Sequence, residues 1–148
     1  MSNTFIPMIP CSVAGPLGVL HLPRLWLKVS LEARGKLAKG YPGIGGGFDS
    51  MVIAGLGLNA DAVRKFITDK RPSYGEFEAW VKAQPGVKLD RASVNKLNQS
   101  ILGYHHDDAT RQGILKTAGY QDNGQGLGAA VELNALDDWA AFYAENLK

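Results

Sequence analysis

The chain has 148 residues, 45% of them hydrophobic and 20% charged, which is typical of one folded domain and too apolar for a disordered protein. Its 16 Lys and Arg against 14 Asp and Glu give a net charge of +2, and their scattered distribution excludes the concentrated basic face of a dedicated nucleic-acid-binding protein. No stretch reaches the roughly 20 apolar residues of a membrane-spanning helix, so we expect a single domain over residues 1–148 with neither a nucleic acid nor a membrane as partner.

Residues 1–20 predict an extended apolar arm. Pro7, Pro10 and Gly15 interrupt any helix in this segment. The segment also lacks the positive leader of an export signal, because the first basic residue is Arg24. We expect the arm of a cytoplasmic protein, lying over the chain's own core or over a partner subunit.

Cys11 is the only cysteine, so no intrachain disulfide forms and a reducing compartment such as the cytoplasm is expected. Its neighbours Pro10, Ser12 and Val13 offer nothing that would stabilise a thiolate. We therefore interpret Cys11 as a small buried apolar residue.

The first helix is predicted to begin at Leu22, because Pro23 suits the first helical turn, where its missing N–H has no intrahelical partner. The apolar residues of one face recur at the helical period. They are Leu22, Leu25, Trp26 and Val29. Lys28 and Glu32, four residues apart, are expected to pair on the wetter side of this helix.

Three further helices are indicated by capping residues. A helix over about 60–68 follows Asn59, a good N-cap. The next follows Ser73, which forms a capping-box pattern with Glu76. Another begins near Asp90.

Two more helices are predicted at about 109–118 and about 135–147, the second capped by Asn134. The apolar stripe of the last helix is expected to face the core and consists of Leu136, Trp139, Ala140, Tyr143 and Leu147. Strand-like alternation is hard to find. The predicted fold class is therefore all-α, a compact single-domain bundle of five to six helices with Gly-rich loops and an extended N-terminal arm.

The run from Gly43 to Gly47 contains four glycines and allows two interpretations. It lacks the Lys-Ser/Thr pair of a P-loop, and no strand precedes it as in a dinucleotide-binding fold. It is either a structural turn or lid, or a loop that contacts a ligand. In the second case, Gly45, Gly46, Gly47 and Asp49 are the ligand-binding residues.

Basic side chains on the first helix offer a second candidate contact for a ligand. Arg24 and Lys28 are four residues apart, so together they could hold a carboxylate or phosphate group. The alternative is a solvated face in which Lys28 pairs with Glu32. His21 precedes this helix beside leucines and is interpreted as a packing residue.

The sequence Tyr104-His105-His106-Asp107-Asp108 is the remaining candidate site. As acid/base groups, His105 and His106 would work with Tyr104 and Asp107. A metal site is disfavoured because adjacent histidines diverge on a helix or a strand, so we expect neither a metal nor a cofactor. A third interpretation is structural: Asp107 or Asp108 caps the next helix.

Arg111 bears on that structural interpretation. It lies on the apolar stripe of the helix that follows the cluster, so its guanidinium needs a carboxylate partner. Asp107, at i−4, is expected to supply it.

Several segments resemble the bacterial family called domain of unknown function 5069. They are HLPRLWLKVSLEARGKL at residues 21–37, GFDS at residues 47–50, NQSILGYHHDDATRQGIL at residues 98–115 and VELNALDDWAAF at residues 131–142. The resemblance covers most of the chain beyond the arm and contains no catalytic signature. It implies a small soluble bacterial protein and assigns no site residue.

Two functions of different classes are expected from these observations. The first is a small-molecule enzyme or ligand-binding protein, with metal-independent acid/base groups and a small polar or anionic ligand in a pocket near the Gly-rich loop. The second is a non-catalytic helical binding or assembly module, such as a homodimer that exchanges its apolar arm.

Overall fold

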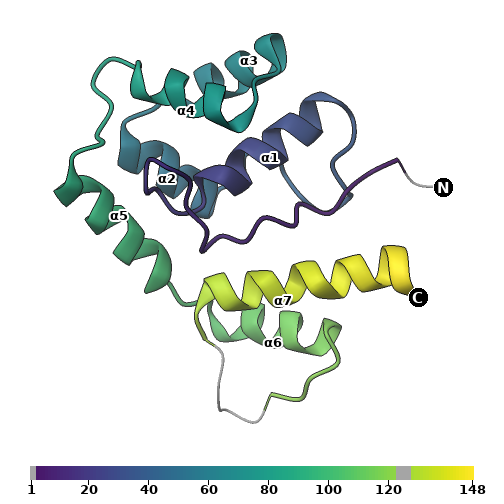
Figure 1. Cartoon of the computed structure of the whole chain (residues 1–148). Coiled ribbons are helices and arrows are strands. Elements are labelled where there is room, and N and C mark those ends of the chain that lie inside the picture. The colour runs from purple at the N-terminus through teal and green to yellow at the C-terminus, as the bar shows by residue number, and fades with distance from the viewer. Residues whose placement is uncertain (1–2, 123–127) are drawn as a thin grey trace.

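The computed structural model describes residues 3–122 and 128–148, and this part of the chain forms seven α-helices and one short π-helix (Figure 1). The elements are α1 (Leu22–Ala33), α2 (Phe48–Leu56), α3 (Ala60–Lys70), α4 (Tyr74–Lys82), α5 (Arg91–Leu102), α6 (Asp108–Thr117), α7 (Ala130–Phe142) and η1 (Tyr143–Leu147). The predicted all-α class is confirmed, and the helix count exceeds the predicted five to six. None of the described helices combines the length and the apolar character needed to cross a membrane.

Helix α1 organises the packing. It packs against α2, α3 and α4, whereas α5 packs against both α2 and α7, and α6 packs against α7. In Figure 1, α3 and α4 lie at one end of the molecule, α6 and α7 lie at the other, and α1 and α2 lie between them. Helix α1 also contacts the last part of the chain, through an ion pair between Arg24 and Asp138 of α7.

The core is built on the predicted apolar face of α1. Leu22, Leu25 and Val29 are at most 1% exposed. They belong to one buried cluster that also contains Leu56 of α2 and Phe77 of α4. Each such side chain contributes about 1.5–3 kcal/mol by leaving water, so this face fixes α1 among its neighbours.

Four helices begin where their capping residues predict. Asn59 and Asp90 each accept a hydrogen bond from a backbone N–H three residues on, at the start of α3 and α5. Ser73 and Glu76 form the complete capping box of α4. Asp107 caps α6 by accepting from the N–H of Thr110 at 2.7 Å. These starts are local, because the side chain satisfies an N–H group that the helix leaves free.

Two helix predictions are corrected. Helix α2 was not predicted and begins immediately after Gly47. Helix α7 begins at Ala130 instead of about residue 135, so Asn134 lies inside it and is not its cap. Its N-cap is Ala129, which has no side-chain acceptor; α7 begins there because the face that starts with Ala130 is buried against the rest of the molecule.

The face of α7 and η1 that was predicted to be buried is largely exposed. Trp139 is 59% exposed, Tyr143 55% and Leu147 66%. Leu133 and Asp138 are buried instead. An ion pair between Asp138 and Arg24, described below, holds this side of α7 toward α1.

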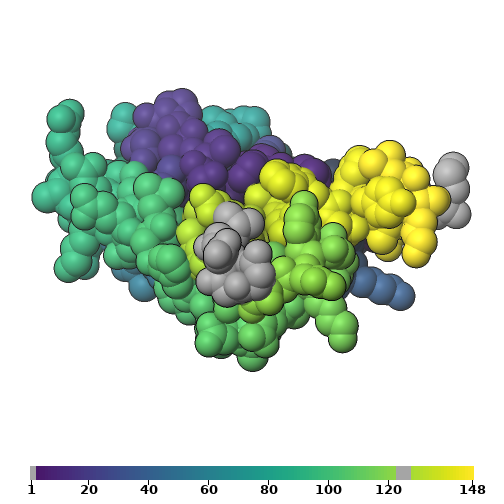
Figure 2. All heavy atoms as spheres, turned by 90° about the horizontal axis from the view of Figure 1, so that it is seen from below, coloured from purple at the N-terminus to yellow at the C-terminus, as the bar shows by residue number. Residues whose placement is uncertain are grey.

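The N-terminal arm packs on its own chain, one of the two placements that were expected. Phe5 exchanges backbone hydrogen bonds with Lys36 and Ala38, and Ile6 is buried. Seen from below, the arm runs directly beside α7 (Figure 2). The arm is thereby brought next to the site described next.

Candidate functional site

A polar cavity of about 270 Å³ lies between the Gly-rich segment, α1 and α7. All six residues predicted to bind a ligand line it. They are Arg24, Lys28, Gly45, Gly46, Gly47 and Asp49. The structure therefore brings together two groups of candidates that the sequence analysis had considered separately.

A buried carboxylate forms the floor of this cavity. Asp49, in the first turn of α2, lies 2.6 Å from Nε2 of His21 through Oδ1 and 2.5 Å from Nζ of Lys28 through Oδ2. The backbone N–H of Gly45 donates to the same Oδ2 at 2.8 Å. All three side chains of this network are at least nine-tenths buried. The predicted Lys28–Glu32 pair is wrong, because Glu32 instead pairs with Arg64 of α3.

The charges of this network follow from its contacts. Burial opposes ionisation of Asp49, but the hydrogen bond from His21 and the charge of Lys28 outweigh it and keep the pKa of this carboxyl below its usual range. Burial lowers the pKa of His21, so its imidazole is neutral near pH 7. An ionised carboxylate only accepts, so Nε2 of His21 carries the proton and donates it to Asp49. Nδ1 is then an acceptor, and it is buried without a hydrogen-bond partner in the described chain.

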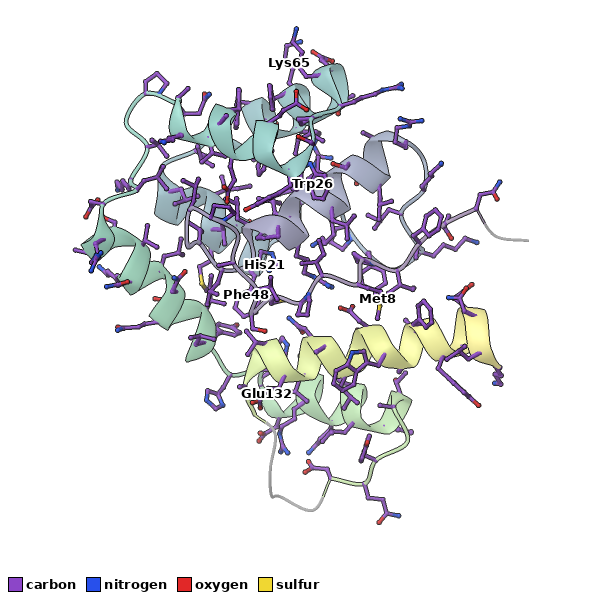
Figure 3. The ribbon with its side chains drawn as sticks, viewed as in Figure 1. Met8, His21, Trp26, Phe48, Lys65 and Glu132 are labelled. Atoms are coloured by element: carbon purple, nitrogen blue, oxygen red, sulfur yellow. The ribbon has the colours of Figure 1, made fainter. Side chains whose placement is uncertain are left out.

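The backbone of His21 is held in an unusual conformation. Its φ of 69° lies in the left-handed region, which costs a residue other than glycine on the order of 1–3 kcal/mol. The ring packs edge-on against Phe48, with 5.6 Å between ring centroids, and Figure 3 shows the two side by side. Contacts with Phe48 and Asp49 thus hold the imidazole against the first turn of α2.

Arg24 is committed to structural partners on the other side of the cavity. It forms a two-pronged ion pair with Asp138 of α7 at 2.6 and 3.0 Å, and it also donates to the carbonyl oxygens of Pro7 and Ile9. Burial alone would lower the pKa of Arg24, but the hydrogen bonds and charge of Asp138 raise it. With these acceptors already in place, Arg24 is poorly suited to hold a free anion.

Helix α7 supplies further polar groups that the sequence analysis did not select. Asn134, Asp137 and Asp138 line the cavity together with Cys11 and Tyr41. Burial and the neighbouring charge of Asp138 raise the pKa of Asp137. Burial likewise raises the pKa of Cys11, in agreement with its interpretation as an unreactive buried thiol.

The histidine cluster is divided by the fold. Tyr104 and His106 line a second cavity of about 230 Å³, which shares Gly46, Gly47, Phe48 and Asn134 with the first. Nε2 of His106 lies 2.8 Å from Oδ1 of Asn134. The ring of Tyr104 packs edge-on against that of Phe48. These two candidates therefore adjoin the polar cavity across the Gly-rich segment.

His105 and Asp107 lie outside both cavities. His105 is exposed and pairs through its backbone with Ala129 in an isolated bridge. Asp107 is the exposed N-cap of α6. The predicted partner of Arg111 is also wrong: its guanidinium bonds Asp122 at 2.7 Å and reaches Asp108 at 3.5 Å.

The start of α2 lies beside both cavities, because Gly47 and Phe48 line each of them. Its N-cap, Gly47, has no side chain to accept from them, and the first backbone bond of the helix runs from Met51 N–H to the Gly47 carbonyl. The N–H groups of residues 48–50 therefore have no intrahelical acceptor. The helix dipole adds about half a positive charge at this end.

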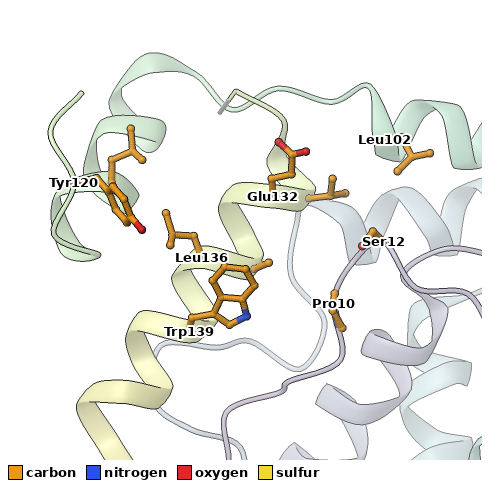
Figure 4. Close-up of a pocket in the computed structure, with 10 residues that line it drawn as sticks. Pro10, Ser12, Leu102, Tyr120, Glu132, Leu136 and Trp139 are labelled. Atoms are coloured by element: carbon orange, nitrogen blue, oxygen red, sulfur yellow. The ribbon is translucent and has the colours of Figure 1, made fainter. Parts of the chain in front are cut away.

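A larger cavity of about 710 Å³ lies on another face of α7 (Figure 4). Leu136 and Trp139 of α7, Leu102 of α5 and Pro10 of the arm contribute to its mostly apolar lining. Among the described residues that line it, Glu132 is the single carboxylate. This cavity is suited to an apolar partner and not to acid/base chemistry.

Metal ligands are not grouped in the described residues: no set of three or more His, Cys, Asp or Glu side chains is arranged to hold an ion. The resemblance to the domain of unknown function 5069 family stays a prediction. No protein-family model, curated protein or solved structure matches the chain.

Proposed function

We propose that this protein binds a small polar molecule in the cavity between the Gly-rich segment and α1, and acts on it by metal-independent acid/base chemistry. The observation that carries the proposal is the buried network of His21, Asp49 and Lys28 on the wall of a polar cavity. The carboxylate of Asp49 fixes the tautomer and orientation of the neutral imidazole of His21, an arrangement that acid/base sites use. Such perturbed groups in a cavity are typical of functional sites.

Each member of the network has a distinct role in this proposal. His21 is the proposed acid/base group, while Asp49 fixes the tautomer and orientation of its ring. The hydrogen bond from His21 and the charge of Lys28 together keep Asp49 ionised. Tyr104 and His106 face the adjoining cavity and are placed to contact the far end of a ligand. The reaction class is proton transfer in a hydrolysis, isomerisation or elimination, and the proposed location is the cytoplasm.

The test begins with a thermal-shift screen of small polar metabolites, followed by turnover measurements on any compound that binds. His21→Asn is the informative variant, because asparagine tolerates the left-handed backbone of residue 21 and lacks the imidazole. We expect it to lower turnover by about 10²-fold or more. The control is Lys65→Met on the exposed side of α3, where turnover should not change.

Two results would count against this function. A folded His21→Asn protein with full turnover would remove His21 from the chemistry. A screen in which no compound stabilises the protein or contacts the cavity would remove the ligand-binding function itself. His105→Asn and His106→Asn, measured in the same assay, test the two histidines that the sequence predicted.

The exposed face of α7 and η1 favours a second candidate, an assembly module. Trp139, Tyr143 and Leu147 form an apolar surface beside the 710 Å³ cavity, and a surface of this kind is typical of contacts between proteins. If this face joins two copies, light scattering will give the mass of a dimer, and Trp139→Ser will convert it to a monomer. A monomeric wild-type protein at high concentration would eliminate the homodimer.

A further inference from the structure

We propose that the ligand of the polar cavity is a small organic amine, bound as an ammonium ion whose N–H groups donate to the carboxylate of Asp137. This inference rests on the proposed function and specifies its ligand class. It replaces the anion that Arg24 and Lys28 suggested in the sequence, because both of these cations are already paired with carboxylates of the protein.

The position of Asp137 on α7 directs its side chain inward. Ala130 and Leu133 are fully buried, and at 3.6 residues per turn they lie on the same side of the helix as Asp137. Asn134 lies on this side as well, where it bonds His106. The side chain of Asp137 therefore projects from the inner face of α7, and it lines the polar cavity.

The carboxylate of Asp137 has no partner among the described residues. Arg24, Asp138 and His106 act on it through their charges and without a hydrogen bond. Burial and the charge of Asp138 raise its pKa. A partly buried carboxylate without a donor is unfavourable. An ammonium group would supply both the donor and the opposite charge.

The other charges around the cavity cancel in pairs. Arg24 is paired with Asp138, and Lys28 with Asp49. Among the described lining residues, Asp137 is thus the carboxylate that no cation offsets. The dipole of α2 adds only about half a positive charge. A ligand that enters the cavity therefore meets a surplus of negative charge, which favours a cation.

The surroundings favour an organic amine over a metal ion. Within the described part of the chain, no three His, Cys, Asp or Glu side chains are arranged to hold a metal. The adjoining cavity of about 230 Å³ shares Gly46, Gly47 and Phe48 with the polar cavity. It adds the apolar surface of Met51 and Tyr104. We expect the apolar part of the amine to lie on this side.

The experiment uses the full-length protein and three probes of similar size and shape. They are n-butylammonium, which is positive, n-butanol, which is neutral, and butyrate, which is negative. Each is titrated at equal ionic strength while the backbone amide resonances of residues 45–48 and 134–138 are followed by NMR. We expect n-butylammonium to move both sets saturably at millimolar concentration, as is usual for so small a ligand. It should bind about fivefold or more tightly than n-butanol and butyrate. Methylammonium, which keeps the charge and lacks the apolar chain, should bind more weakly than n-butylammonium.

The variants Asp137→Asn and Asp61→Asn form a matched pair, because each replaces a helical carboxylate by a neutral amide of the same shape. Asp137→Asn should weaken n-butylammonium binding about fivefold or more and leave n-butanol binding unchanged. It should not lower the melting temperature, because the lost carboxylate has no donor and is repelled by Asp138. Asp61 is exposed in the first turn of α3, away from the cavity, and its variant should bind n-butylammonium as the wild type does.

Each part of the inference has its own contrary result. Binding of n-butanol or butyrate as tight as that of n-butylammonium would refute the cation, and equal binding of methylammonium would refute the apolar part. An Asp137→Asn protein that binds n-butylammonium like the wild type, or that melts well below it, would show that Asp137 is not the unpaired carboxylate. If none of the probes moves these resonances while a different compound from the metabolite screen occupies the cavity, the amine inference fails and the proposed function stands. If nothing binds in the cavity, both fail.

Discussion

Replacing Asp138 by alanine should strongly destabilise the protein, because it leaves the charge of Arg24 buried and unpaired. The side chains of Arg24 and Asp138 are 7% and 5% exposed. Removing one partner of a buried ion pair costs about 3–5 kcal/mol. Two backbone carbonyls, those of Pro7 and Ile9, remain as acceptors for Arg24, so the lower part of this range is expected. Tyr41 also loses the acceptor of its hydroxyl, which adds to the cost.

Urea and thermal denaturation of Asp138→Ala measure this effect. For a chain of this size about 1 kcal/mol shifts the melting temperature by about 2–4 °C, so 3–5 kcal/mol corresponds to a decrease of about 6–20 °C. The double variant Arg24→Met/Asp138→Leu should be more stable than Asp138→Ala, because it leaves no charge unpaired. Asp69→Ala, which breaks an exposed pair with Lys65, is the control and should change the midpoint little. A loss below about 1 kcal/mol for Asp138→Ala would refute a buried, unsolvated pair.

Three further outcomes are expected. The pKa of His21 lies below its ordinary value of 6.5, so the unfolded chain takes up a proton first and the free energy of unfolding should fall as the pH drops below about 6.5. In urea titrations between about pH 7 and pH 5, His21→Asn should remove this part of the decline, whereas the control His105→Asn should keep it. Equal curves for the two variants would contradict the assignment to His21. Gly57→Ala should lower the free energy of unfolding by more than about 1 kcal/mol, because Gly57 has a φ of 75° and a Cβ would lie 3.2 Å from the carbonyl oxygen of Gly86. An unchanged urea midpoint would show that alanine fits this turn without strain. Ser73→Ala should lower the free energy of unfolding by about 1 kcal/mol through loss of the capping box. A melting temperature equal to that of the wild type would show that α4 does not depend on this cap.

Helix starts were predictable where one side chain decides them. Ser73 and Asp107 satisfy backbone N–H groups three residues away, so the pattern is complete within a few positions of sequence. Helix α2 was missed for the opposite reason. Glycine at residue 55 lowers helix propensity, but a Cβ there would lie 2.8 Å from Leu97 Cδ1, so the glycine lets α2 approach α5 closely. That advantage comes from the tertiary structure.

The candidate site was predictable in its members and not in its pairings. The i,i+4 rule connects residues on one helix, so it paired Lys28 with Glu32 and could not find Asp49 of α2. The same rule paired Arg111 with Asp107 and missed Asp122, which lies beyond α6. In both cases the partner in the structure lies outside the helix concerned, where a rule for residues within one helix cannot find it.

A stronger signal for the buried network was present in α1. Leucines and other apolar residues occur around most of this helix, and a helix that is apolar all round is buried. A charged residue on such a helix is buried with it and needs a carboxylate. This reasoning would have assigned hidden partners to Arg24 and Lys28, although it would not have identified Asp138 and Asp49. His21 would have been included as the residue that immediately precedes the same helix.

The ion pair between Arg24 and Asp138 also has a consequence for synthesis in the cell. Its partners are 114 residues apart, so at roughly 5–20 residues per second about 6–23 s pass between their incorporation by the ribosome. During that time α1 has emerged with a guanidinium that belongs in the interior but has no counter-charge. The nascent chain is therefore expected to keep α1 solvated or chaperone-bound until α7 arrives, and slow codons between the two helices would lengthen that interval.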